Sequence, residues 1–379
     1  MTIVLFCPDR HLVYDGSSPD RQGVGGGVTF RIRLAAALAD RGHRVTVLCN
    51  CQRKSEYDGV EYLPLEGIPS MRVDVLIVHS SGGGLDVTSA DRLPVQAQVR
   101  MLMTSGVDCP KGAENQHFDS ICVPSDFIRN TVRKNWALRD VPIFIAHYGV
   151  CPTPLLRRLL AGPRSRQRMI YSSHPSKGLT AAIGVLQALQ KKAPRFTLHV
   201  CGGNRLWGGV DESLPQVPGL IHHGLLGQRV LALEYWRSSF AIHLQTREEP
   251  FGISLVESMA AGCIAIASPA GAYSELIRNE IDGLLLPGDP LETATQARAA
   301  ELILGVLDNP KRMRGMQRNA RRAPLAWSTV AHAFEQHMGC LLGQVKLRES
   351  GPCPECGLPL NEFVDAIRCA ACGYHHRRW

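Results

Sequence analysis

The chain contains two separate series of short apolar segments that alternate with helix-like segments. In the first half, buried strands are predicted at 2–7, 43–49, 74–81, 120–125 and 142–150, with a helix over 28–41. In the second half, they are predicted at 169–173, 196–203, 220–224, 240–245, 263–269 and 283–288. Such alternation is typical of parallel sheets flanked by helices. The sequence therefore predicts an α/β chain with two Rossmann-like domains.

The segment 151–167 differs from both series, because it combines three prolines with a run of arginines. We interpret it as the linker between an N-terminal domain (1–150) and a second domain (168–325). A helix-like segment follows within 326–345, and residues 350–379 form a distinct tail.

The composition is that of an ordinary globular chain: 379 residues, 45% hydrophobic and 20% charged. No apolar stretch approaches the ~18 residues of a membrane-spanning helix, and the first residues, MTIVLFCPDR, lack the basic leader of a signal peptide. Apart from four in the tail, the 13 cysteines are scattered, mostly within apolar strands, as reduced thiols are in the cytosol. We therefore expect a cytoplasmic protein.

The formal net charge of +8 is concentrated in the segments 157–168, 311–322 and 375–379. Basic patches of this kind attract anionic membranes, nucleic acid or phosphorylated substrates. The plainer interpretation is a solvated basic face together with a phosphate-binding cleft. Peripheral contact with the inner membrane face, or with nucleic acid, stays open at this point.

Two carboxylates eight positions apart, Glu249 and Glu257, stand between two of the predicted strands. The segment around them, REEPFGISLVESMAAG, predicts a loop followed by a helix over about 252–261. If Pro250 occupies the first helical turn, the N–H groups of 251–253 point outward between the two acids. At 1.5 Å rise per residue, the two acids lie roughly 10–12 Å apart. This is the span of a sugar ring, a diphosphate and a ribose, and the free N–H groups of 251–253 at the helix start suit the diphosphate. For an isolated pair, a solvated helix with two unrelated acids would be the simpler interpretation.

Two further turns have the composition of anion-binding loops. Residues 23–27, Gly-Val-Gly-Gly-Gly, open the first predicted helix, where glycines permit close backbone approach to a phosphate or sugar. Lys177 and Gly178 follow the first strand of the second domain, and a lysine there can neutralise a departing diphosphate. An ordinary tight turn and a surface lysine are the alternatives.

In their order and spacing, five segments together resemble the retaining glycosyltransferases of the GT-B fold that carry an E-x7-E donor site (glycosyltransferase family 4). These segments are 23–48, 176–179, 198–204, 248–262 and 271–288. The resemblance covers about residues 1–340. It implies two facing Rossmann-like domains with a deep interdomain cleft, and a last helix within 326–345 that crosses back to the N-terminal, acceptor-side domain.

The resemblance also implies roles for individual residues. Glu249 would hold the hydroxyls of the transferred sugar, and Glu257 those of the ribose. Lys177 would neutralise the diphosphate, and His79, at the end of a first-domain strand, would lie near the sugar and acceptor. The other donor-binding residues implied are Gly26, Gly27, His174, Gly202, Gly203, Asn204, Gly224, Leu225, Phe251, Gly252 and Ile253. For His79, a purely structural role is the alternative.

The sequence departs from the family at Ser172, because an arginine usually stands there, five residues before the lysine. His174 can share the phosphate role, or an arginine elsewhere can replace the charge. The candidates are Arg247 in the second domain and Arg21, Arg31 or Arg33 in the first.

Together these features predict a retaining hexosyltransferase that moves a sugar from a nucleotide-diphosphate sugar (a UDP- or GDP-sugar) to an unidentified acceptor: a glycan, lipid-linked group, protein, small molecule or nucleic acid. A retaining glycosidase would need two carboxylates about 5 Å apart, which this spacing does not suggest. We therefore expect front-face transfer, in which the diphosphate helps to deprotonate the acceptor. No D-x-D pair stands at a strand end, so no catalytic divalent metal is expected. The alternatives are another sugar-nucleotide reaction such as epimerisation, and a nucleic-acid- or protein-binding module with a vestigial sugar site.

The tail carries four cysteines in two C-x2-C pairs, Cys353/Cys356 and Cys369/Cys372, with a glycine after each pair. Four thiolates close a tetrahedral Zn²⁺ site with no open position, which makes the expected zinc structural. The pattern resembles a zinc ribbon, and a disulfide pair is the alternative. Such a ribbon can bind an acceptor, a partner protein or nucleic acid, and its sequence does not distinguish among these three.

Overall fold

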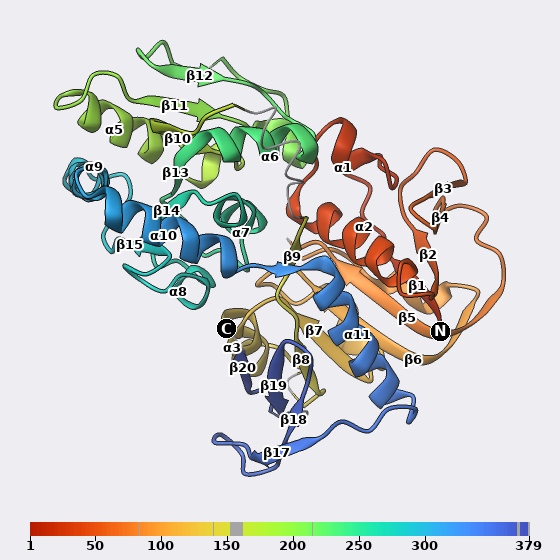
Figure 1. Ribbon diagram of the computed structural model, residues 1–379. Coiled ribbons are helices and arrows are strands. Elements are labelled where there is room, and N and C mark those ends of the chain that lie inside the picture. Colours follow the sequence, from red (N-terminus) through yellow and green to blue (C-terminus); the bar gives the residue numbers. More distant parts are fainter. Residues whose placement is uncertain (83, 139, 152–161, 214, 370–371, 378–379) are drawn as a thin grey trace. The chain divides into compact units, whose positions relative to one another are not determined.

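The computed structural model describes residues 1–379 except 83, 139, 152–161, 214, 370–371 and 378–379. The chain divides into two compact units (Figure 1). The first comprises Met1–Ser17, Gly27–Gly149 and Leu325–Trp379, and the second comprises Ser18–Gly26 and Val150–Pro324. Most of the predicted linker 151–167 lies outside the described residues, and its last part already belongs to a strand that begins at Ser165.

The first unit is built on an eight-stranded sheet in the order β3-β4-β2-β1-β5-β6-β7-β8. Neighbouring strands are parallel except for β3, which pairs antiparallel with β4. The strands are β1 (Thr2–Phe6), β2 (Arg44–Leu48), β3 (Ser55–Tyr57), β4 (Val60–Leu63), β5 (Met71–Ser80), β6 (Val95–Thr104), β7 (Ser120–Val123) and β8 (Ile143–Ile145). The parallel sheet predicted for the first half is therefore confirmed.

The predicted strand over 142–150 is two strands. β8 ends at Ile145, and β9 (Gly149–Val150) pairs with β16 (Leu325–Ala326) in a separate two-stranded sheet. The close approach at Gly149 gives the reason, because a β-carbon there would lie 2.8 Å from the backbone of Trp327. The chain leaves the large sheet to make this contact, and the continuous apolar composition of the segment hides the break.

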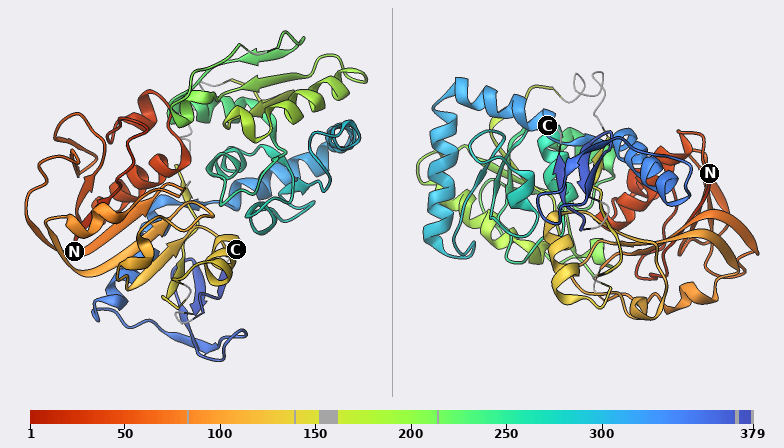
Figure 2. Two further views of the ribbon diagram at one scale, coloured as in Figure 1. Left: turned by 180° about the vertical axis from the view of Figure 1, so that it is seen from behind. Right: turned by 90° about the horizontal axis from the view of Figure 1, so that it is seen from below.

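The helices of the first unit come from distant parts of the sequence. They are α2 (Gly26–Ala39), α3 (Asp126–Asn135) and α11 (Trp327–Leu341), with 3₁₀ turns η1 (Thr88–Arg92) and η2 (Ala113–Asn115). Helices α2 and α11 lie side by side (Figures 1 and 2), with the ring centroids of Phe30 and Phe334 6.2 Å apart. The last long helix therefore packs into the core of the first unit.

The second unit is built on six strands that are all parallel, in the order β12-β11-β10-β13-β14-β15. They are β10 (Ser165–Tyr171), β11 (Thr197–Val200), β12 (Leu220–His222), β13 (Ser238–His243), β14 (Ile264–Ala267) and β15 (Gly283–Leu285). The helices are α1 (Ser18–Arg21), α5 (Leu179–Gln190), α6 (Gln228–Arg237), α7 (Ile253–Ala260), α8 (Tyr273–Leu276), α9 (Thr293–Leu307) and α10 (Pro310–Arg322), with 3₁₀ turns η3 (Pro175–Lys177) and η4 (Asn204–Trp207). Because the strands are parallel, their carboxyl ends share one edge, which is where α/β sheets bind ligands.

The tail forms a four-stranded antiparallel sheet that belongs to the first unit. Its strands are β17 (Glu349–Pro352), β18 (Pro359–Glu362), β19 (Ala366–Cys369) and β20 (His375–Arg377). It lies against β8 and α3 (Figure 2): Arg368 donates to the carbonyl oxygen of Ile145 at 2.8 Å, and Arg129 pairs with Glu355 at 3.1 Å. The guanidinium of Arg368 is buried between the rings of Phe144 and Phe363, each about 4.8 Å away, and is paired with Asp365. The tail is thus docked by buried contacts on the last strand of the large sheet.

In the described part of the chain, no helix combines the length and apolar character that crossing a bilayer requires.

Candidate functional site

The predicted site residues of the second unit gather at the carboxyl edge of its sheet. His174 and Lys177 follow β10, and Glu249 follows β13. Gly202, Gly203 and Asn204 follow β11, whereas Gly224 and Leu225 follow β12, and Phe251, Gly252, Ile253 and Glu257 lie at or within the start of α7. Parallel neighbouring strands therefore bring together residues that are far apart in the sequence.

Lys177 and Glu249 form an ion pair, in which the lysine Nζ donates to the carboxylate Oε2 at 2.6 Å. The carboxylate is 9% exposed and the lysine side chain 20%, so water reaches the pair poorly. The two loops are joined because the N–H of Thr246 donates to the carbonyl oxygen of Lys177 at 3.0 Å. Gly178 permits this approach, since a β-carbon there would lie 2.1 Å from the carbonyl oxygen of Leu244. The geometry of the pair is therefore set by the ends of β10 and β13.

Glu257 lies in the second turn of α7, and its Oε1 accepts a hydrogen bond from Gln228 at the start of α6 (2.7 Å). The helix predicted over about 252–261 is confirmed as α7, and because α7 begins at Ile253, Pro250 lies before the first helical turn. Gly252 has a left-handed backbone (φ 95°), which interrupts the helix before that point, and its missing side chain leaves room for the ring of Tyr273.

The start of α7 presents backbone donors at this edge. The N–H of Leu255 donates to the carbonyl oxygen of Gly252 at 3.0 Å. The N–H groups of Ile253 and Ser254 precede this bond and stand outside the helical hydrogen-bond pattern. Gly26 belongs to the same corner, since a β-carbon on it would lie 3.5 Å from Cδ1 of Ile253. Gly27 lies elsewhere, in the first unit beside Ser81.

An aromatic residue that sequence reasoning missed, Trp207 in η4, gathers the basic side chains of the site. The ring of His174 stacks on it with centroids 3.8 Å apart, and Lys177 Nζ and Arg247 Cζ each lie 5.7 Å from its centroid. We call these four residues the Trp207 cluster. A tryptophan in a polar loop gives no pattern that could have identified it, because its role depends on how η4 folds back towards β10.

The arginine expected near Ser172 has no space there. Ser172 is 9% exposed, and its hydroxyl hydrogen-bonds to the hydroxyl of Tyr235 at 2.6 Å in the interior of the second unit. Of the alternative cations, Arg31 is fully buried in the first unit and paired with Asp9 at 3.0 Å, whereas Arg247 is exposed at the carboxyl edge. Arg21 is exposed within the second unit, and Arg33 is half-buried on α2.

His79 lies at the carboxyl end of β5 in the first unit, and it is buried. Its Nε2 contacts the hydroxyl of Ser105 at 3.1 Å, and that hydroxyl contacts the hydroxyl of Tyr148 at 2.7 Å. Burial, and after it the charge of Arg31, holds the pKa of His79 well below 6.5, so its ring is neutral at pH 7. The neutral His79 ring therefore stands at one end of a hydrogen-bonded series that continues through the hydroxyl groups of Ser105 and Tyr148.

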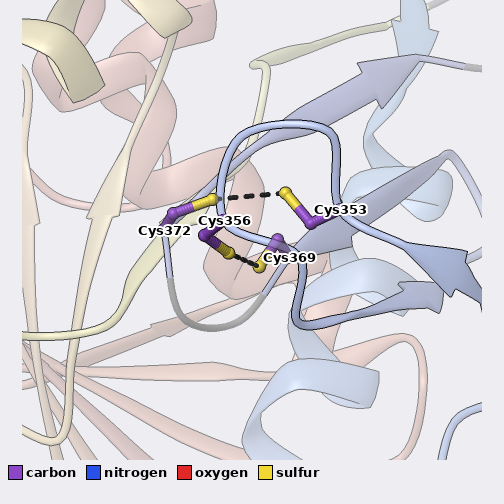
Figure 3. Close-up of side chains that lie close together, drawn as sticks. All are labelled: Cys353, Cys356, Cys369 and Cys372. Carbon is purple, nitrogen blue, oxygen red and sulfur yellow. Dashed lines mark hydrogen bonds between the residues drawn. The ribbon is translucent and has the colours of Figure 1, made fainter.

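The four tail cysteines converge (Figure 3). Their Sγ atoms all lie within 4.8 Å of one another, and Cys353–Cys372 and Cys356–Cys369 are 3.5 Å apart. None is in a disulfide. Tetrahedral Zn–S bonds of about 2.3 Å place sulfur atoms about 3.8 Å apart, so the cluster fits a zinc ion.

A second group with metal-ligating side chains, His199, His223 and Glu234, lies in the second unit. Here the carboxylate of Glu234 is already paired with Arg168 and Arg237. Two guanidinium groups on the same carboxylate oppose a further cation. We therefore interpret this group as an ion-pair network.

His243, at the end of β13, makes the stability of the fold depend on pH. It is 1% exposed, and burial together with the charge of Lys177 lowers its pKa from 6.5 to about 3. Between pH 3 and 6.5, His243 is therefore protonated in the unfolded chain and neutral in the folded chain. With respect to this residue, the free energy of unfolding is highest above pH 6.5 and decreases as the pH falls. We expect the free energy of unfolding of H243Q, measured by urea titration between pH 7 and 4.5, to fall less steeply than wild type by about 1.4 kcal/mol per pH unit.

The control for this prediction is H117Q, because the His117 side chain is 82% exposed. Its slope is expected to match that of the wild type. Equal slopes for H243Q and wild type would show that His243 is not held neutral by the fold.

Comparisons with known proteins show which proteins the second unit and the whole chain resemble. Residues 166–323, nearly all of the second unit, match the family model described as "Glycosyl transferases group 1". A phosphatidyl-myo-inositol mannosyltransferase of Mycobacterium tuberculosis is 28% identical over 182 residues, which are 46% of this chain and 47% of that protein. The match thus spans about half the length of this curated relative.

Two solved structures resemble nearly the whole chain. A sucrose-phosphate synthase from Thermosynechococcus elongatus has a TM-score of 0.65 at 17% identity, and the alignment covers 91% of this chain and 100% of that one. Anabaena HepE in complex with UDP has a TM-score of 0.60 at 14% identity, with 90% and 100% covered. Because identities this low report the fold alone, they confirm the predicted fold class. The chain has the GT-B fold, and residues 166–323 of its second unit are similar to the glycosyl transferases group 1 family.

Proposed function

We propose that the protein is a retaining, metal-independent glycosyltransferase that uses a nucleotide-diphosphate sugar. One observation carries this proposal: the ion pair of Lys177 and Glu249 shares a sheet edge with Glu257, within the region that matches the glycosyl transferases group 1 model. The pair and Glu257 lie on either side of the start of α7, and the N–H groups of a helix start favour an anion such as a diphosphate.

In the proposed reaction, an acceptor hydroxyl attacks the anomeric carbon from the side on which the diphosphate leaves. The bond from that carbon to the diphosphate oxygen breaks, and the departing oxygen takes the acceptor proton. Lys177 and the N–H groups at the start of α7 stabilise the developing negative charge. Glu249 accepts hydrogen bonds from the sugar hydroxyls, which fixes the anomeric carbon in position.

The remaining contacts of the donor follow the strand ends. Glu257 is proposed to accept from the ribose hydroxyls in place of the present donor, Gln228. Gly202, Gly203, Asn204, Gly224 and Leu225 are proposed to line the nucleotide, and Gly26, Gly27 and His174 to lie near the phosphates. His79 is proposed to act on the acceptor side, where its neutral ring can accept a hydrogen bond.

We further propose that the four tail cysteines hold one structural Zn²⁺ ion. Four thiolates leave no open coordination position, so the ion would hold the β17–β20 sheet together and take no part in transfer. All cysteines in the described residues are free thiols, which supports a reducing, cytoplasmic location.

Incubation of the full chain with UDP-glucose, GDP-mannose and ADP-glucose tests the proposed function. UDP-sugars come first, because the resembling HepE structures contain UDP and UDP-glucose. We expect one donor to bind and to be hydrolysed slowly without acceptor, in the presence of EDTA at a concentration that leaves the structural zinc bound. Absence of donor binding, combined with salt-sensitive retention of DNA or RNA, would favour the nucleic-acid-binding alternative instead.

A further inference from the structure

Two cationic side chains share one aromatic ring at the carboxyl edge of the second unit. Lys177 Nζ and Arg247 Cζ each lie 5.7 Å from the centroid of Trp207, within the range of cation–π attraction. Arg247 also donates from Nη2 to the hydroxyl of Ser176 at 3.4 Å. Both cations are thus oriented by contacts with η3 and η4.

The two cations differ in whether a carboxylate is paired with them. Lys177 is matched by the carboxylate of Glu249 at 2.6 Å. Across the residues that the structure describes, no carboxylate lies within ion-pair distance of Arg247, although the exposed Glu248 is its neighbour in sequence. The pKa of His174 is lowered by burial and by the charges of Lys177 and Arg247, so its ring adds no competing charge. Arg247 is therefore the cation of the Trp207 cluster that has no counter-ion.

This arrangement suits an anion with more than one charge. A diphosphate carries at least two negative charges, and Lys177 has already been matched by Glu249. The position from which an additional arginine was expected, Ser172, is buried against Tyr235 and cannot supply one.

We infer that Arg247 binds the diphosphate of the donor as its second cation, and that Trp207 is the positioning residue for its guanidinium. The inference rests on the proposed function and names the residue that replaces the charge missing at Ser172. Arg247 reaches the phosphates from the β13–α7 loop, whereas Lys177 reaches them from the loop after β10.

Calorimetric titration of the full chain with nucleoside diphosphates and monophosphates tests the inference. For the diphosphate (UDP, GDP or ADP) that the wild type binds, R247A is expected to raise Kd at least tenfold, because a charge-assisted contact is lost. The Kd of the corresponding monophosphate is expected to change less than about twofold. R247K should recover part of the diphosphate affinity, since it keeps a point charge. W207A should shift Kd in the same direction by about threefold.

The matched control is R195A, which removes one exposed positive charge just before β11, at the opposite edge of the same sheet. It should leave both Kd values unchanged. Wild type that binds a diphosphate as tightly as R247A does would overturn the inference and leave the proposed function standing. Equal losses for monophosphate and diphosphate would also overturn it. A wild type that binds none of the three diphosphates would overturn the proposed function, and the inference with it.

Discussion

Replacing Glu249 by glutamine is expected to lower donor hydrolysis and sugar transfer by about 10²–10³-fold, while the affinity for the nucleoside diphosphate is not weakened. The rate falls because an amide holds the sugar hydroxyls less well than a buried carboxylate does. The affinity is kept because the substitution releases Lys177 from its 2.6 Å ion pair and leaves its charge to the diphosphate. Steady-state rates and calorimetric Kd values measured on the same preparation separate the two effects.

Two further variants make this result specific. E257Q is expected to raise the Kd of the nucleoside diphosphate about tenfold, because Glu257 is assigned to the ribose. E248Q changes the exposed neighbouring acid and should behave as wild type. If E249Q kept the wild-type rate, the assignment of Glu249 to the sugar would be wrong.

Loss of zinc is expected to destabilise the first unit, and not only the tail. C369S should release the bound zinc and lower the melting temperature by on the order of 10 °C. Without the metal, the β17–β20 sheet cannot hold Arg368 against Ile145 and between Phe144 and Phe363. Disrupting a buried charge network of this kind costs about 3–5 kcal/mol. Metal analysis and thermal unfolding of the full chain measure both quantities.

Two control variants distinguish the tail cysteines from other residues that could bind zinc. C151S changes an exposed cysteine outside the cluster and should keep one zinc per chain at the wild-type melting temperature. H199A should also keep one zinc, because Glu234 is occupied by arginines. Zinc that persists in C369S, or melting that does not respond to its loss, would contradict the proposed structural site.

Much of the fold could be predicted because buried parallel strands are continuous apolar runs. The strands of the first large sheet that were missed lack that signal: β6, VQAQVRMLMT, mixes glutamines and an arginine with its apolar residues, and β3 and β4 are short strands at one edge. Their absence from the prediction did not alter the fold class, since β1, β2, β5, β7 and β8 had already been identified.

The candidate site could be predicted in its residues but not in its contacts. Lys177 and Glu249 are 72 positions apart and meet because β10 and β13 are neighbours, and sequence does not give this strand order. The same holds for Trp207, whose ring lies under cations from two other loops. The position of Pro250 before the helix has a local cause, because the left-handed turn at Gly252 delays the start of the helix. The catalytic and binding roles themselves stay predictions.

A crystal structure of the full chain with a bound nucleotide sugar tests the central claim most directly. We expect the sugar hydroxyls at Glu249, the diphosphate at Lys177 and at the first N–H groups of α7, and the ribose at Glu257. A donor bound elsewhere, with the 249–257 segment unchanged and the ion pair of Lys177 and Glu249 intact, would contradict the account.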